Sequence, residues 1–310
     1  MCGIVGYLGH RQAYPILIKG LQRLEYRGYD SAGIALINDS GLITYKKQGK
    51  VADLESHCEG KDIASSIGIG HTRWATHGVP NDINAHPHYS QNRKLAIIHN
   101  GIIENYDTIK EALVQRGHTF YSDTDTEVLI HLIEDIKNKG NFTLFESVRL
   151  ALNEVIGAYA ISVVSEDNPE EVIVARMGSP LVVGIGENEY FIASDATPIV
   201  EYTKEVIYLE EGEIAKLSLS NGVELKTIEN IEKTPFIQEL ELNLEAIEKG
   251  GYDHFMLKEI FEQPKSIADS IRGRLLSKEG IIKMSGIDTY SDKIVNANRI
   301  IIVACGTSWH

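Results

Sequence analysis

The sequence predicts a mixed α+β domain in which two antiparallel sheets are covered by helices. Short apolar stretches typical of strands lie on both sides of a block of amphipathic helices at residues 105–155. Turn residues separate the later strands, including the Asn221-Gly222 pair that is typical of a β-hairpin. The pattern changes after about residue 240, so we expect a second part of the chain to begin there.

The first hundred residues predict strands around a single helix. Cys2 to Leu8 is a short apolar run that predicts a strand. Apolar residues at helical spacing then predict a helix, namely Tyr14, Leu17, Ile18, Leu21 and Leu24. Further strands are expected at Ala32–Ile37, Leu42–Lys46, Ile67–Thr72 and Lys94–Asn100.

The middle of the chain predicts three helices followed by a series of strands. The helices are Asn105–Arg116, which Gly117 closes, Thr124–Lys137 and Leu144–Val155. The strands are expected at Tyr159–Val164, Glu171–Arg176, Leu181–Ile185, Tyr190–Ala193, Val206–Leu209, Glu213–Leu219 and Val223–Thr227. We place the end of this domain near residues 219–232, and the first domain at 2–230.

Residues 231–310 predict linker helices and the start of another domain. Helices are expected at Gln238–Glu248 and Asp253–Leu276, the second with a break or kink at Pro264. Arg299–Ala304 is rich in β-branched residues and predicts a strand buried on both faces, which usually opens a parallel α/β domain. No helix follows to cover it, so we expect a fragment of a longer protein. The alternative is an edge strand that completes the first domain.

Composition excludes several classes of function. The net charge of −14 argues against binding to a nucleic-acid backbone. No run approaches the ~18 apolar residues of a membrane span, and the N-terminus does not resemble a signal peptide. The three cysteines are far apart, which indicates a reduced, cytoplasmic protein without a disulfide framework.

Cys2 is the first candidate for catalysis. Removal of Met1 would leave a thiol and a free α-amine on the same residue. The two groups titrate near ~8.5 and ~7.7–8.0, so both lie close to neutral pH. A nucleophile beside a base suits acyl transfer, although a cysteine can occupy this position by chance.

A second candidate is the loop His71–Gly78, which contains an arginine, a tryptophan and two histidines. Arg73 suits a bidentate grip on a carboxylate. The alternative is a solvated loop with one buried tryptophan. A related polar loop, Arg27–Gly33, enters another strand.

Two further groups follow in the sequence. His99-Asn100-Gly101 ends a strand, where an amide side chain and a backbone N–H can form an oxyanion hole. Thr124–Glu127 opens a helix, and its carboxylates can equally cap the helix. His86 and His88 lie two residues apart in a proline-containing loop without obvious further ligands, so we expect no metal and no cofactor.

These motifs together closely resemble the glutamine–fructose-6-phosphate aminotransferase family. The resemblance is carried by Cys2–Gly6, Arg23–Gly33, His71–Gly78, His99–Gly101, Thr124–Glu127 and Met256–Pro264, in this order. It implies a class-II glutamine amidotransferase domain over residues 2–230. The implied fold is a four-layer αββα sandwich of the N-terminal-nucleophile hydrolase type.

The resemblance also implies roles for single residues. Cys2 would attack the side-chain amide of L-glutamine and release ammonia, with its own α-amine moving the protons. Asn100 and Gly101 would hold the oxyanion. Arg73 would bind the substrate α-carboxylate and Asp125 its α-ammonium. The loop that closes over glutamine would contribute Trp74, Thr76 and His77.

For the second part, the resemblance implies a truncated α/β sugar-isomerase segment. Thr307 and Ser308 would belong to its first phosphate-binding loop, an incomplete site here. The complete protein would convert fructose 6-phosphate to glucosamine 6-phosphate as a cytoplasmic homodimer, without membrane or nucleic acid. Two alternatives remain: the amidotransferase that aminates phosphoribosyl pyrophosphate, and a glutamine-sensing module without turnover.

Overall fold

The computed structural model describes residues 2–75, 77–140, 142–240, 251–271, 275–276, 280–282 and 290–304. The chain divides into two compact units, residues 1–247 and 248–310, which are described separately. Within the described ranges, no helix has both the length and the apolar character that a membrane crossing requires.

The first unit contains two antiparallel sheets. The first sheet has the strand order β15-β11-β9-β10-β1-β4-β2-β3. Its central strands are β1 (Gly3–Leu8), β4 (Ile67–Arg73) and β2 (Ser31–Asn38). The outer strands are β3 (Gly41–Gln48), β9 (Val182–Gly186), β10 (Glu189–Ala193), β11 (Glu205–Tyr208) and β15 (Gln238–Glu239).

The second sheet has the order β14-β13-β12-β8-β7-β6-β5. Its strands are β5 (His88–Tyr89), β6 (Leu95–Ile103), β7 (Gly157–Ser165), β8 (Asn168–Met177), β12 (Glu213–Ser218), β13 (Gly222–Thr227) and β14 (Glu232–Lys233). The predicted Asn221-Gly222 hairpin is confirmed, because β12 pairs with β13 across it.

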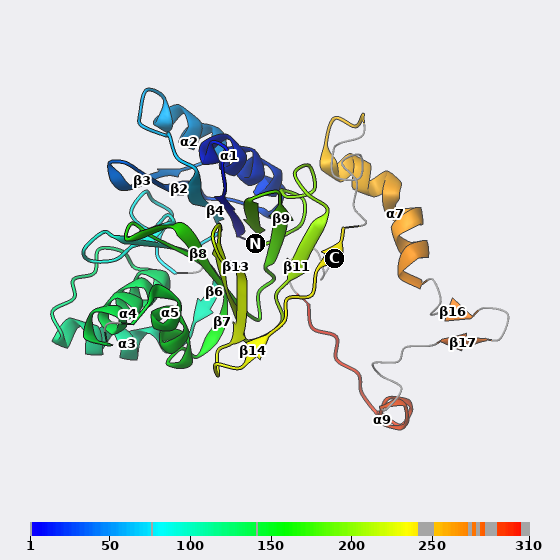
Figure 1. Ribbon diagram of the computed structural model, residues 1–310. Helices are drawn as coiled ribbons and strands as arrows, with labels where there is room; N and C mark the ends of the chain where they lie inside the picture. Colours follow the sequence, from blue (N-terminus) through cyan, green and yellow to red (C-terminus); the bar gives the residue numbers. More distant parts are fainter. Residues whose placement is uncertain are drawn as a thin grey trace. The chain divides into compact units, whose positions relative to one another are not determined.

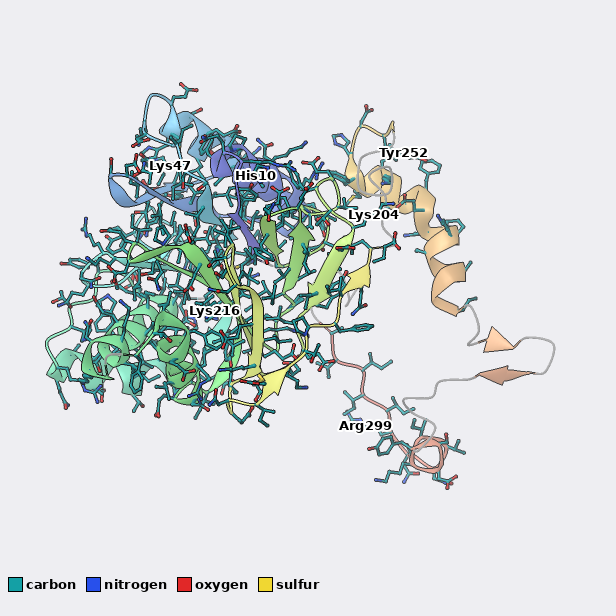
Figure 2. All side chains as sticks on the ribbon, in the orientation of Figure 1. His10, Lys47, Lys204, Lys216, Tyr252 and Arg299 are labelled. Carbon is teal, nitrogen blue, oxygen red and sulfur yellow. The ribbon has the colours of Figure 1, made fainter. Side chains whose placement is uncertain are left out.

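Helices cover the outer face of each sheet, which gives four layers (Figure 1). The first sheet carries α1 (Ala13–Leu24) and α2 (Val51–Cys58), and a 3₁₀ turn, η1 (Glu25–Arg27), follows α1. The second sheet carries α3 (Tyr106–Gln115), α4 (Asp125–Gly140) and α5 (Leu144–Asn153). Side chains fill the space between the ribbons of these layers (Figure 2).

Strand alternation produces three apolar cores. On β1, Val5 and Tyr7 face α1, whereas Ile4 and Leu8 face the second sheet. The third core lies between the second sheet and α3, α4 and α5. Burying one large aliphatic side chain contributes about 1.5–3 kcal/mol, so the layers are held together mainly by these residues.

The predicted strands and helices of the first domain are confirmed, with ends that differ by a few residues. Apart from the 3₁₀ turn η1, three elements were not predicted: α2, β5 and β14. In α2 only Val51, Leu54 and Cys58 are buried, which is too few positions to stand out as a helical period. The other two are strands of two residues, too short to leave a pattern.

The chain after residue 237 differs from the prediction in three places. Helix α7 (Phe255–Ile271) runs through Pro264, so the predicted break is wrong and a kink at this proline stays a prediction. The helix ends before Leu275–Leu276, which form β16. β16 pairs with β17 (Ile281–Ile282), and a short helix, α9 (Ser291–Val295), follows. The helix predicted at Gln238–Glu248 is wrong at its start, because Gln238–Glu239 pair with β11 as β15. Residues 241–248 lie outside the described ranges.

The strand predicted at Arg299–Ala304 is not formed. Ile300 to Val303 are 66–89% exposed and have no strand assignment, and Figure 2 labels Arg299 at the start of this run. The alternative prediction, that residues 299–304 form an edge strand of the first domain, is therefore also wrong. A strand buried on both faces needs a partner on each side and layers above and below. The described part of the chain supplies none of these for residues 299–304.

Candidate active site

Three strands bring polar residues to one end of the layer between the sheets. On β4, Ile67 and Ile69 face this layer, and on β6 Ala96 and Ile98 do the same. Continued alternation places His71 and Arg73 on the same face of β4, and Asn100 on the same face of β6. The register of β1 against β4 pairs Gly3 with Thr72, which places Cys2 beside Arg73.

Cys2 lies at this end, partly buried, with its sulfur held by the loop after β4. The backbone N–H of Trp74 donates a hydrogen bond to Cys2 Sγ at 3.1 Å, and the sulfur lies 3.4 Å from Trp74 O. Burial raises the pKa of the Cys2 thiol, and the Trp74 N–H opposes this rise. A thiolate at Cys2 would accept the same N–H bond, so the loop is arranged to receive a negative sulfur.

Asn100 reaches across from the second sheet to the same residue. Its Nδ2 donates to Cys2 O at 3.2 Å, and its Oδ1 lies 2.9 Å from His71 Nε2. Gly101 follows with a φ of +139°, and a Cβ there would meet Ala158 O at 2.0 Å. Only glycine fits this position, so the backbone beside Asn100 adopts a conformation that other residues cannot.

Arg73 is buried, and backbone carbonyls occupy its guanidinium. Its Nη2 donates to His77 O and, at 3.3 Å, to Gly78 O. Its Nη1 lies 3.9 Å from Asp30 Oδ1. The loop that follows β4 therefore folds back over the guanidinium.

The aromatic residues of this loop lie on its two sides. Trp74 is 54% exposed, so the alternative of a loop with one buried tryptophan is wrong. A Cβ on Gly28 would meet the Trp74 ring at 2.6 Å, so this glycine makes room for the indole. The His77 ring packs edge-on against Tyr106 at 5.3 Å between centroids. Thr76 lies outside the described residues.

The start of α4 provides two kinds of carboxylate. Asp125 is buried, and its Oδ2 accepts from the Ile103 N–H at 2.8 Å, which ties it to β6 beside Gly101. Glu127 instead accepts the N–H groups of Tyr121 and Ser122, while Thr124 Oγ1 accepts from the Glu127 N–H at 3.3 Å. The Thr124 hydroxyl therefore caps α4, whereas the Glu127 carboxylate holds the loop before the helix and is not bonded to an N–H of α4.

Four buried histidines lie beneath these residues: His71, His86, His88 and His99, here called the histidine cluster. The rings of His71 and His86 lie 4.3 Å apart, and those of His86 and His88 lie 4.8 Å apart. Burial lowers the pKa of all four, that of His71 to about 3, so the rings are neutral near pH 7. In the described ranges, no group of three or more His, Cys, Asp or Glu residues is placed to hold a metal ion.

The structure brings together Cys2, Arg73, Asn100, Gly101 and Asp125 at the ends of β1, β4, β6 and α4. Thr307 and Ser308 lie outside the described residues. Sequence reasoning interpreted His71 and His99 as hydrogen-bonding or packing residues but assigned no role to Asp30, which faces Arg73. Asp30 lies in the polar loop 27–33, and its position just before a strand was the available signal.

Two curated proteins are similar to this chain over its whole length. The chain is 59% identical over 311 residues to a glutamine–fructose-6-phosphate aminotransferase (isomerizing) of Bacteroides thetaiotaomicron and 53% identical over 314 residues to that of Chlorobaculum tepidum. These alignments cover 100% of this chain and 51% of each relative, so the chain spans about half the length of the curated relatives it matches.

Solved structures show a similar fold. A glutamine phosphoribosylpyrophosphate amidotransferase from B. subtilis superimposes with a TM-score of 0.63 at 32% identity, over 73% of this chain and 49% of that one. The family profile described as glutamine amidotransferase domain matches residues 56–243. This match spans more than half of the chain, and the chain therefore belongs to the glutamine amidotransferase family.

Proposed function

We propose that this chain hydrolyses the side-chain amide of glutamine, with Cys2 as the nucleophile, and releases ammonia. The observation that carries the proposal is the meeting of Cys2 with Asn100, whose amide donates to Cys2 O at 3.2 Å. An amide donor beside a nucleophilic sulfur is the arrangement that acyl transfer requires. Membership of the glutamine amidotransferase family supplies the substrate class.

The reaction begins when the thiol loses its proton to the α-amine of Cys2, which exists only after Met1 is removed. The sulfur attacks the amide carbon and forms a tetrahedral intermediate. Collapse of this intermediate breaks the C–N bond, and the amine returns its proton to the departing nitrogen, which leaves as ammonia. Water then hydrolyses the γ-glutamyl thioester, which releases glutamate and restores the thiol.

Asn100 and Gly101 stabilise the oxygen of the intermediate. Asn100 Nδ2 carries two N–H groups, and one of them donates to Cys2 O. We assign the second N–H to the oxyanion, together with the backbone N–H of Gly101. Removal of one such donor typically lowers kcat by about 10²–10³.

Arg73 and Asp125 recognise the charged end of glutamine. The His77 and Gly78 carbonyls occupy Arg73 Nη2, whereas Nη1 has no hydrogen-bond partner among the described residues, so we assign Nη1 to the α-carboxylate. Asp125 uses Oδ2 for the Ile103 N–H, and we assign its other oxygen to the α-ammonium. The loop with Trp74, Thr76 and His77 would cover the bound substrate.

In a longer protein, the ammonia would be transferred to fructose 6-phosphate to give glucosamine 6-phosphate. The relatives bearing that name match this chain over only half of their length, so the second half would complete the reaction. Residues 2–230 would then form the glutaminase domain, and 231–310 would lead into an isomerase domain with Thr307 and Ser308 in its phosphate loop. We expect a cytoplasmic homodimer. The identity of 59% favours this assignment over phosphoribosyl pyrophosphate amination, where the identity is 32%.

Ammonia release from glutamine by the chain without Met1 tests the proposal. Cys2→Ala should abolish the release, because Cys58, the other cysteine among the described residues, is buried away in a core. Cys58→Ala is the matched control, since Cys58 is buried in the core beneath α2 and should leave the rate unchanged. Equal release by Cys2→Ala and the wild type would show that Cys2 is not the nucleophile. A wild type that binds glutamine without releasing ammonia would instead indicate a sensing module.

A further inference from the structure

His71 contacts the proposed oxyanion residue directly. It is fully buried on β4, and its Nε2 lies 2.9 Å from Asn100 Oδ1. Burial lowers the pKa of His71 to about 3, so the ring is neutral and carries a single N–H near pH 7. The mechanism described above uses no proton from this ring.

The hydrogen bond assigns the position of that proton. Asn100 Nδ2 faces Cys2 O, so Oδ1 faces His71 and can only accept. His71 Nε2 must therefore be the donor. The contact with Asn100 therefore indicates the Nε2–H form.

We propose that His71 is a positioning residue, whose Nε2–H turns the Asn100 amide so that its N–H groups face the reacting carbonyl oxygen. An amide side chain can rotate by half a turn with little change in shape. In the rotated form, Asn100 would present its oxygen to the developing negative charge and repel it. The Cys2 carbonyl on one side and the His71 donor on the other side select the first form. This inference rests on the proposed function.

The remaining histidines fix the His71 ring. His86 packs against it with centroids 4.3 Å apart, and His86 Nε2 lies 2.9 Å from Thr126 Oγ1. The Thr126 hydroxyl in turn lies 2.9 Å from His99 Nδ1, and His99 Nε2 lies 3.4 Å from Ala158 O. With neutral rings, each contact in this series joins one donor to one acceptor.

The backbone around the cluster prevents it from shifting. A Cβ on Gly33 would meet His86 O at 2.2 Å, so the loop carrying His86 lies directly on β2. Thr126 follows Asp125, so the same series of contacts reaches the residue assigned to the substrate ammonium. The orientation of Asn100 is thus tied to both sheets and to the start of α4.

The test uses two variants of His71 and one control. His71→Phe keeps the ring and its packing but removes the donor, whereas His71→Gln keeps an N–H near the position of Nε2. The control is His131→Phe, because His131 is equally buried on α4, away from Cys2, and already stacks on Phe120 at 4.7 Å. Ammonia release is measured against glutamine concentration for the chain without Met1.

The expected result is a loss in kcat with little change in KM. His71→Phe should lower kcat by at least about tenfold. The loss should not exceed about 10²–10³, which is the loss expected when an oxyanion donor is removed. His71→Gln should recover most of the rate, and His131→Phe should match the wild type. In an Asn100→Ala background, His71→Phe should cost nothing further, because its effect passes through Asn100.

Three outcomes would overturn the inference. They are full kcat in His71→Phe, a loss from His71→Phe that is as large in the Asn100→Ala background as in the wild type, or a proton on Nδ1 of His71. The last is read from the ¹⁵N spectrum of the histidine-labelled wild type, so it needs no variant to fold. Failure of the proposed function is distinguishable, because then the wild type itself would release no ammonia.

Discussion

The layer between the two sheets has two regions, an apolar body and a polar end. The same faces of the same strands supply the side chains of both regions. Ile69 on β4 and Ile98 on β6 belong to the body, and both are fully buried in aliphatic surroundings. Two residues further along each strand lie the polar residues His71, which is fully buried, and Asn100, which is 7% exposed. Strand pairing and register are continuous across this change.

The difference shows what each half contributes. The apolar body stabilises the fold by burying aliphatic side chains, which need close packing but no specific hydrogen-bond partner. At the polar end, buried groups such as His71 and Asn100 pair with each other, because a buried polar group without a partner costs about 1–3 kcal/mol. The apolar body supplies the stability that this polar end requires.

Ile98→Ala tests the contribution of the body and should give the largest loss of stability. Replacing a buried isoleucine by alanine typically costs about 2–5 kcal/mol, since the surrounding side chains close the cavity only partly. The measurement is the free energy of unfolding in urea. The KM for glutamine should stay the same in the folded fraction, and a changed KM with unchanged stability would contradict the division.

Arg73→Lys tests the polar end and should act mainly on substrate binding. Lysine keeps the charge but loses the planar guanidinium that can hold a carboxylate with two bonds. The expected loss in kcat/KM is about 1.5–3 kcal/mol, the scale of a hydrogen bond to a charged group. Steady-state rates at varied glutamine measure it, with urea unfolding as the control. Unchanged glutamine parameters would remove Arg73 from the carboxylate role.

The two halves should also differ in their response to pH. Burial holds the pKa of His88 well below its ordinary value near ~6.5, so the unfolded chain binds a proton there that the folded chain does not. The free energy of unfolding therefore falls as pH drops below about 6.5. His88→Gln should flatten this fall by up to about 1.4 kcal/mol per pH unit. Ile98→Ala should lower the whole curve and leave its slope unchanged. Identical slopes for the wild type and His88→Gln would show that His88 titrates alike in both states.

Much of this organisation could be predicted from the sequence, because alternation along strands is local. The runs Ile67–Thr72 and Lys94–Asn100 predicted β4 and β6, and with them the positions of Arg73 and Asn100. The partner of a buried polar group is not local. His71 and Asn100 are 29 positions apart, and the two belong to different sheets, so no spacing rule could join them.

Burial also depends on partners that are distant in the sequence, which explains why the strand predicted at Arg299–Ala304 is not formed. Leu95–Ile98 and Ile300–Val303 are similar apolar runs, yet only the first forms a strand. β6 has β5 and β7 as neighbours, and helices and the first sheet cover its faces. The apolar composition of a run indicates that it can be buried, but not that the described chain offers a place to bury it.

Ile302→Ala is the matched partner of Ile98→Ala and should have the smallest effect. Ile302 is 89% exposed, so its removal leaves no cavity and the folded chain loses little packing. The expected change in the free energy of unfolding is within about 0.5 kcal/mol, as for most surface substitutions, and ammonia release should be unchanged. Both variants are measured in the same urea titration, followed by a signal from the first unit. A loss for Ile302→Ala that approaches the loss for Ile98→Ala would show that residues 300–303 are buried in solution after all, and that similar apolar runs find similar environments in both units.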